Sequence, residues 1–119
     1  MMKKEKNSLD KLIIIWTSGD KKVALSMVFM YALNAKKREW WKEVCLIVWG
    51  PSAKLLADDL ELQEYLARMK EAGVEIEACK TCAEIYGVTN QLEEFGIDVK
   101  LMGMPLTEYL KNGYKVMTF

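Results

Sequence analysis

The sequence predicts a single α/β domain built on a mostly parallel β-sheet. Short apolar segments rich in β-branched residues recur along the chain, a segment of helical character follows each of the first four, and glycine or capping residues separate them. The run at residues 12–16 is apolar at every position, which is typical of a strand buried on both faces of a parallel sheet. A chain of 119 residues is long enough for one packed core and too short for two.

Strand and helix alternate along the whole chain. We expect strands at residues 12–16, 44–49, 74–78, 97–101 and 114–119. We expect helices from the turn at 17–20 to about residue 38, from 52 to the stop signal Gly73, after residue 80, at 89–95 and at 105–111. The pair Asp58-Asp59 allows the second of these to divide into two helices. Residues 1–10 are polar and are expected to form a flexible N-terminal segment before a domain at residues 11–119.

The composition argues against several kinds of partner. Lys plus Arg and Asp plus Glu number 17 each, so no basic surplus attracts nucleic acid. The longest apolar stretch, 23–33, is interrupted by Ser26 and is too short to span a membrane. No signal peptide is evident, so we expect a cytoplasmic protein without membrane or nucleic-acid partners. An odd count of three cysteines does not form a secreted disulfide framework and favours free, catalytic or redox-active thiols.

The first expected helix is unusually apolar. Between residues 23 and 33 only Ser26 is polar, although a surface helix normally keeps a polar face. A small layered fold has few places to bury a helix on all sides. We therefore expect self-association through Phe29, Met30 and Leu33, with residues 40–41 (Trp-Trp) extending the contact surface.

The segment Cys79-Lys80-Thr81-Cys82 carries the most distinctive chemistry. It lies where the third strand gives way to a short helix, and Thr81 with Glu84 forms a capping-box pattern. This pattern predicts that Thr81 caps the helix and that Cys82 is its first residue. The positive helix end and the neighbouring Lys80 would then favour a Cys82 thiolate. Cys79 at the strand end is a second possible nucleophile, and both cysteines can also be read as small residues that pack a strand–helix junction.

Other sites are less well supported by the sequence. The carboxyl ends of parallel strands share one edge of a sheet, so Thr17, Ser18 and Gly50 are expected to line the same crevice as the cysteine loop. A zinc site lacks ligands, because there is one cysteine pair, no histidine, and a third cysteine, Cys45, inside an apolar strand. We expect no metal and no cofactor. A thioredoxin-like dithiol is a weaker alternative, because the pair follows the third strand rather than the first.

The chain resembles the DsrE/DsrF-like family over residues 12–119. The resemblance is carried by the segments Trp-Gly-Pro-Ser-Ala-Lys-Leu-Leu at 49–56, Gly-Val-Glu-Ile-Glu-Ala-Cys at 73–79, Tyr-Gly-Val at 86–88 and Met-Pro-Leu-Thr-Glu-Tyr-Leu at 104–110. It implies a three-layer flavodoxin-like fold whose five-stranded sheet has the order 2-1-3-4-5. It also implies assembly into a homo-oligomer, as a trimer, hexamer or dimer.

The family includes small sulfur-relay subunits, and the resemblance implies a role for each thiol. At the position of Cys79, relay members carry the cysteine that accepts a persulfide sulfur and passes it on, between donor and acceptor proteins. Cys82 stands where these members often have a small residue, and it would act as a second thiol. Two alternatives stay open, namely a non-catalytic ligand-binding or assembly module with structural cysteines, and a dithiol–disulfide redox protein.

Overall fold

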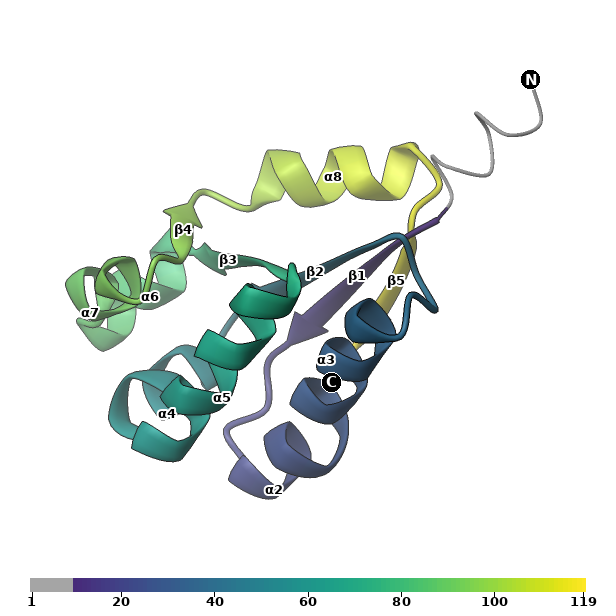
Figure 1. Ribbon diagram of the computed structural model, residues 1–119. Coiled ribbons are helices and arrows are strands. Elements are labelled where there is room, and N and C mark those ends of the chain that lie inside the picture. Colours follow the sequence, from purple (N-terminus) through teal and green to yellow (C-terminus); the bar gives the residue numbers. More distant parts are fainter. Residues whose placement is uncertain (1–9) are drawn as a thin grey trace.

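Five parallel strands form one sheet in the order β4-β3-β2-β1-β5 (Figure 1). The computed structural model describes residues 10–119. The expected flexible segment at residues 1–10 therefore lies, apart from Asp10, outside the described residues. The strands are β1 Lys11–Trp16, β2 Glu43–Val48, β3 Glu75–Cys79, β4 Asp98–Lys100 and β5 Lys115–Thr118.

The α/β class and the five strands are confirmed, but the expected strand order 2-1-3-4-5 is wrong. The chain adds β2, β3 and β4 in succession on one side of β1 and reverses direction once, to place β5 on the other side of β1. Strand β1 is thus flanked by β2 and β5, with Leu12 opposite both Val44 and Lys115. Apolar periodicity identifies strands but does not say which strands are neighbours, so the order required the structure.

The helices begin and end largely where their caps predict. The first expected helix consists of α2, a π-helical segment η1 and α3, which follow one another without a break. Asp20 caps its start, and the Asp20 side chain accepts a hydrogen bond from the Lys22 amide at 2.8 Å. Asp59 caps a separate helix and divides the second helical stretch as the sequence allowed. The helices are α2 Lys21–Val23, η1 Ala24–Val28, α3 Phe29–Lys37, α4 Ser52–Asp58, α5 Leu60–Ala72, α6 Lys80–Tyr86, α7 Thr89–Glu94 and α8 Gly103–Lys111.

The two faces of the sheet are covered very differently. Helices α3, α4 and α5 pack on one face, where their apolar side chains and the even-numbered residues of β1 form the larger core (Figure 1). Of the described helices only α8 crosses the other face, on its way from β4 at one edge to β5 at the opposite edge. This arrangement follows from right-handed crossovers, because the chain moves in one direction from β1 to β4 and in the other from β4 to β5.

The apolar first helix is mostly explained by burial in the larger core. Phe29 is fully buried, and its ring lies edge-on to Trp16 with 4.8 Å between ring centroids. The expectation that Phe29 takes part in self-association is therefore wrong, because the side chain is used inside the domain. Met30 and Trp40 do remain exposed, at 45% and 56%. No helix within residues 10–119 is long and apolar enough to cross a membrane.

Candidate functional site

The carboxyl ends of β1 and β2 are tied together by Ser52. This residue is fully buried, and its hydroxyl donates to the Trp16 carbonyl at 2.5 Å and to the Trp49 carbonyl at 3.2 Å. Its backbone amide donates to the Thr17 carbonyl at 3.1 Å. The loop that follows β2 is thereby held against the end of β1, which fixes the position of Gly50.

Gly50 contacts the cysteine loop directly. Its φ of +79° lies in the left-handed region that favours glycine. In this conformation the Gly50 backbone lies close enough to the Cys82 thiol to lower its pKa. The sequence expectation that Gly50 lines the cysteine site thus corresponds to a contact in the structure.

Cys79 and Cys82 lie next to each other at the carboxyl end of β3. Cys79 is the last residue of β3 and is only 5% exposed, whereas Cys82 is half-buried. The two thiols are neighbours close enough for Cys79 to influence the pKa of Cys82, and both are free. Burial raises the pKa of the Cys82 thiol, the neighbouring Cys79 thiol raises it further, and the Gly50 amide opposes the shift. Cys82 therefore keeps its proton at neutral pH.

The predicted cap of the short helix is wrong, and so is its consequence for acidity. Helix α6 begins at Lys80 with Cys79 in the cap position, so Thr81 is not the cap and Cys82 is the third helical residue rather than the first. We expected the helix end to lower the pKa of Cys82, but desolvation outweighs that effect and raises it. The capping-box pattern predicted the wrong start of the helix because β3 continues as far as Cys79 and leads into α6 without an intervening loop.

The remaining predicted residues make no side-chain hydrogen bond to this pair. Lys80 and Thr81 are exposed on the first turn of α6. The Thr17 hydroxyl and backbone amide both donate to the Phe119 carbonyl, at 2.8 and 2.6 Å, and the Ser18 hydroxyl accepts from the Asp20 amide at 3.0 Å. The hydroxyls of Thr17 and Ser18 thus stabilise the carboxyl edge of the sheet.

Sequence reasoning missed a buried carboxylate on the same face of β3. Glu77 is 7% exposed, and it accepts hydrogen bonds from the Tyr109 hydroxyl at 2.9 and 3.1 Å. Lys100 of β4 forms an ion pair with it at 2.9 Å, and the Cys45 thiol donates to it at 3.5 Å. A glutamate inside an expected strand whose other residues are mostly apolar is the signal that identifies it, because a buried charge requires partners.

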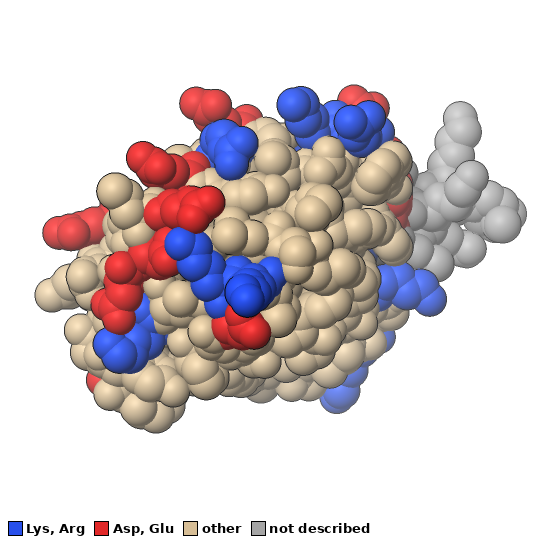
Figure 2. Space-filling view, turned by 90° about the horizontal axis from the view of Figure 1, so that it is seen from below, with Lys and Arg blue, Asp and Glu red and all other residues tan. Residues whose placement is uncertain are grey.

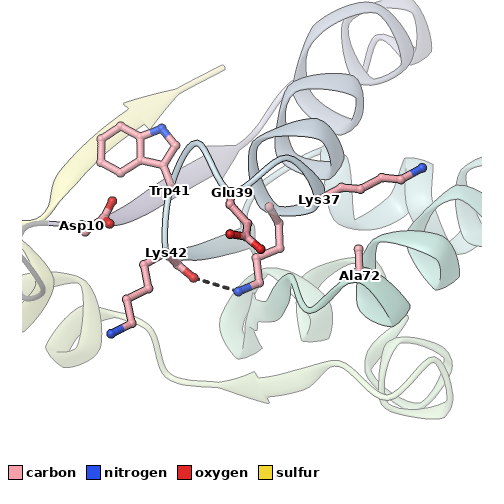
Figure 3. A pocket seen from close by; sticks show the side chains of 7 residues that line it. Asp10, Lys37, Glu39, Trp41, Lys42 and Ala72 are labelled. Carbon is pink, nitrogen blue, oxygen red and sulfur yellow. Dashed lines mark hydrogen bonds between the residues drawn. The ribbon is translucent and has the colours of Figure 1, made fainter.

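A hollow lies at the amino end of the sheet, opposite the cysteine loop, and none of the predicted site residues line it. It measures about 660 Å³ and lies before the starts of β1, β2 and β3, between Asp10, Lys42 and Ala72 (Figure 3). The Lys36 ammonium group donates to the Lys42 carbonyl at 2.7 Å, and the side chains of Lys37 and Lys42 point in opposite directions. Its cations do not converge on one point, so this hollow has no arrangement that would select a ligand. Within residues 10–119, no three potential metal ligands lie together.

Comparison with known proteins identifies the family. Residues 10–119 match the DsrE/DsrF-like family. The chain belongs to this family. The resemblance noted from the sequence is thereby confirmed, and membership suggests a role in sulfur relay. No curated protein matches the chain.

Solved structures support the fold of this DsrE/DsrF-like protein. A conserved protein of unknown function from Bacteroides thetaiotaomicron, BT1422, is 47% identical with a TM-score of 0.90, over 92% of this chain and 95% of that one. The ychN protein of E. coli (18% identity, TM-score 0.74) and a protein of unknown function from Methanobacterium thermoautotrophicum, MTH1491 (17%, 0.68), each align over 92% of this chain and 98% of their own. At this low identity the last two show the fold alone.

Proposed function

We propose that this protein accepts a persulfide sulfur on Cys79 and passes it on, with Cys82 as a second thiol. Family membership supports a sulfur-relay role. The observation that carries the assignment to these residues is the neighbouring pair of free thiols at the carboxyl end of β3. Two adjacent thiols at a strand end suit sulfur exchange, because each can attack a sulfur bound to the other.

The transfer consists of two thiol-exchange steps without net oxidation. The Cys79 thiolate attacks the terminal sulfur of a donor persulfide, R–S–SH. A bond forms between the Cys79 sulfur and that sulfur, the donor S–S bond breaks, and the donor leaves as R–S⁻. An acceptor thiolate then attacks the terminal sulfur of Cys79–S–SH and regenerates the Cys79 thiolate.

Cys82 can take the sulfur from Cys79 by the same exchange. Its thiol lies next to that of Cys79 and is the more exposed of the two. A raised pKa slows its attack, since the thiolate is the nucleophile. Cys79 is therefore the first acceptor in this scheme, and Cys82 acts second, toward the solvent side of the site.

Mass spectrometry after incubation with a low-molecular-weight persulfide tests the scheme. Trypsin cleavage at lysines separates all three cysteines, into peptides 43–54, 71–80 and 81–100. We expect one added sulfur on peptide 71–80. The variant Cys79→Ser should lose this adduct, Cys82→Ser should keep it, and Cys45→Ser serves as the control with unchanged loading.

Three outcomes would contradict the scheme in different ways. Loading of peptide 81–100 in Cys79→Ser at the wild-type rate would make Cys82 the acceptor. Absence of an adduct on either peptide would favour a binding or assembly module with structural cysteines. Formation of a Cys79–Cys82 disulfide with release of sulfide, in place of a transferable persulfide, would favour a dithiol redox protein.

We also propose that copies of the chain associate through helix α3. Met30 of α3 and Trp40, which lies in the turn after the helix, are exposed, and with Met27 and Tyr31 they line a shallow apolar hollow of about 180 Å³. Figure 2 views the helix layer from outside, where charged side chains gather toward one side and the rim and leave a broad area without charges. Apolar surface of this kind is favoured at the centre of interfaces.

Light scattering coupled to size-exclusion chromatography tests this contact. The wild-type protein should elute as a homo-oligomer, and Met30→Lys should lower its mass toward that of one chain. Leu110→Lys, a change at a side chain of similar exposure on α8, is the matched control and should leave the mass unchanged. A monomeric wild-type protein would contradict the proposal.

A further inference from the structure

We propose that helix α8 is a movable cover over Cys79, held closed by the contact between Tyr109 and Glu77. Cys79 is only 5% exposed, although sulfur exchange requires that a second molecule reach its sulfur. That the opening admits a sulfur donor to Cys79 rests on the proposed function. The opening itself is inferred from packing and can be measured without any sulfur donor.

Helix α8 is the element that separates this face of the sheet from solvent. Cys79 belongs to a small apolar cluster with Ile13, Ile15, Cys45 and Ile47. Met102, which immediately precedes α8, completes this cluster, and Leu106 and Tyr109 of the helix pack on it. Figure 1 shows α8 alone above the strands on this side, while several helices cover the opposite face. Movement of α8 is therefore the direct route by which the Cys79 side of the sheet becomes accessible.

The helix is weakly held by apolar contacts. None of its nine residues is fully buried, whereas the thirteen-residue α5 on the other face buries Leu62, Leu66 and Met69. Met104 and Leu110 are 70% and 56% exposed. Burial of apolar surface is the main force that docks a helix, so α8 belongs to the less stable, locally opening part of the domain.

Polar contacts at Tyr109 provide the attachment that apolar burial does not. Its hydroxyl donates to both carboxylate oxygens of Glu77, and Lys100 holds the same carboxylate from β4. The Lys11 ammonium group lies 5.1 Å from the centre of the Tyr109 ring and 5.5 Å from that of Tyr114. A hydrogen bond to a charged carboxylate at low exposure is among the stronger single contacts in a protein.

A glycine lies at each end of α8, where the backbone can rotate if the helix moves. The helix starts at Gly103, and a Cβ at this position would meet no atom within 4 Å. At the other end Gly113 has a φ of +81° before β5 begins. Hinges commonly lie at the ends of elements, where a few residues take up the rotation. The helix can thus swing while β4 and β5 stay in the sheet.

Alkylation of Cys79 measures the opening. The purified protein is treated with N-ethylmaleimide, and modification of peptide 71–80 is followed by mass spectrometry. Tyr109→Phe removes only the hydroxyl that bonds Glu77, and we expect Cys79 to react faster by about tenfold to a hundredfold, the factor that corresponds to one hydrogen bond to a charged group. Glu77→Gln, which keeps the side-chain volume, should act in the same direction.

Tyr114→Phe is the matched control. Its ring lies tilted at 45° to that of Tyr109, with 5.9 Å between centroids, and also faces Lys11, but its hydroxyl makes no side-chain hydrogen bond within the described residues. This variant should leave the Cys79 rate within about twofold of wild type, because contacts to the ring are kept. Urea dependence separates opening from unfolding, since local opening exposes less surface and has a shallower slope.

The cover and the proposed function fail in distinguishable ways. Equal alkylation rates in Tyr109→Phe and Tyr114→Phe would overturn the cover even if Cys79 loads a persulfide. Wild-type Cys79 that reacts as fast as a free thiol would overturn it as well, as would labelling with the urea slope of global unfolding. Faster alkylation in Tyr109→Phe without any persulfide loading would support the cover and contradict the sulfur-relay role.

Discussion

The Cys45 thiol donates a hydrogen bond to the Glu77 carboxylate, with 3.5 Å between Sγ and Oε1. The two residues lie on the neighbouring strands β2 and β3, on the face that α8 covers. Cys45 is fully buried, as its position in an apolar strand predicts. It is nevertheless a partner of a charged group and not only a packing residue.

Because of Cys45, the free energy of unfolding should decrease at alkaline pH. Burial, followed by the negative charge of Glu77, raises its pKa above the ordinary value of 9.0. Above about pH 9 the unfolded chain therefore loses this proton and the folded protein keeps it, so the free energy of unfolding falls as pH rises, by up to about 1.4 kcal/mol per pH unit. Urea denaturation between pH 8 and 10 should show this decline in the wild-type protein.

The variant Cys45→Ala isolates this effect from other titrating groups. It should be less stable than wild type at pH 8 and should lose about 1 kcal/mol less on going to pH 10. In the folded wild-type protein peptide 43–54 should also resist alkylation at both pH values. Parallel stability curves for the two proteins, or ready labelling of Cys45, would contradict the burial of a protonated thiol.

Gly50→Ala should change the chemistry of Cys82 without removing a sulfur. The left-handed backbone at Gly50 costs a non-glycine residue about 1–2 kcal/mol, and relief of that strain moves the amide that contacts Cys82. Because this amide lowers the pKa of Cys82, we expect the alkylation of peptide 81–100 to shift to higher pH. Gly87→Ala, at a φ of +68° with open space around the added Cβ, carries similar strain and should leave the pH profile of Cys82 unchanged.

Ser52→Ala should destabilise the carboxyl edge of the sheet. The buried hydroxyl joins the carbonyls of Trp16 and Trp49, and its loss should cost about 1–2 kcal/mol in urea unfolding. Ser26→Ala is the control, since the exposed Ser26 hydroxyl bonds only the Lys22 carbonyl of its own helix. It should stay within about 0.5 kcal/mol of wild type. Equal effects of the two changes would show that Ser52 does not link the strands.

Two adjacent aspartates should differ in their effect on stability. Asp59 caps α5 and accepts from the Leu62 amide at 3.0 Å, so Asp59→Ala should cost about 1 kcal/mol. Asp58 pairs with Lys54 on an exposed surface, and Asp58→Ala should cost less than about 0.5 kcal/mol. Thermal unfolding of the two variants side by side measures the difference, and a reversed order would contradict the capping role.

Local features of the sequence predicted most of the elements. Asp20, Asp59 and Gly73 are caps or stop signals that act within one helix end, and the structure uses all three in this way. The capping box at Thr81 is equally local but failed, because pairing of β3 with β4 extends the strand to Cys79, opposite Lys100. A tertiary contact thus decided where the helix begins.

Features that depend on distant segments could not be predicted. The strand order depends on whether β3 pairs with β2 or with β1 and on where β5 joins the sheet. The shift of the Cys82 pKa depends on burial by the surrounding fold. The Glu77 cluster combines side chains from β2, β3, β4 and α8. Its one visible sign in the sequence was a charge in a strand with apolar neighbours, and its partners could be named only from the structure.

The single reversal in strand order has a consequence for folding. Strands β1 to β4 are joined by successive crossovers. Strand β5 pairs with β1 through residues such as Leu12 and Lys115, which lie near opposite ends of the sequence. Distant pairings of this kind form late, because a long loop must close first. The face that α8 covers, which contains all three cysteines, is accordingly the last to close. We therefore expect the three sulfurs to stay accessible in the folding chain until β5 and α8 have docked.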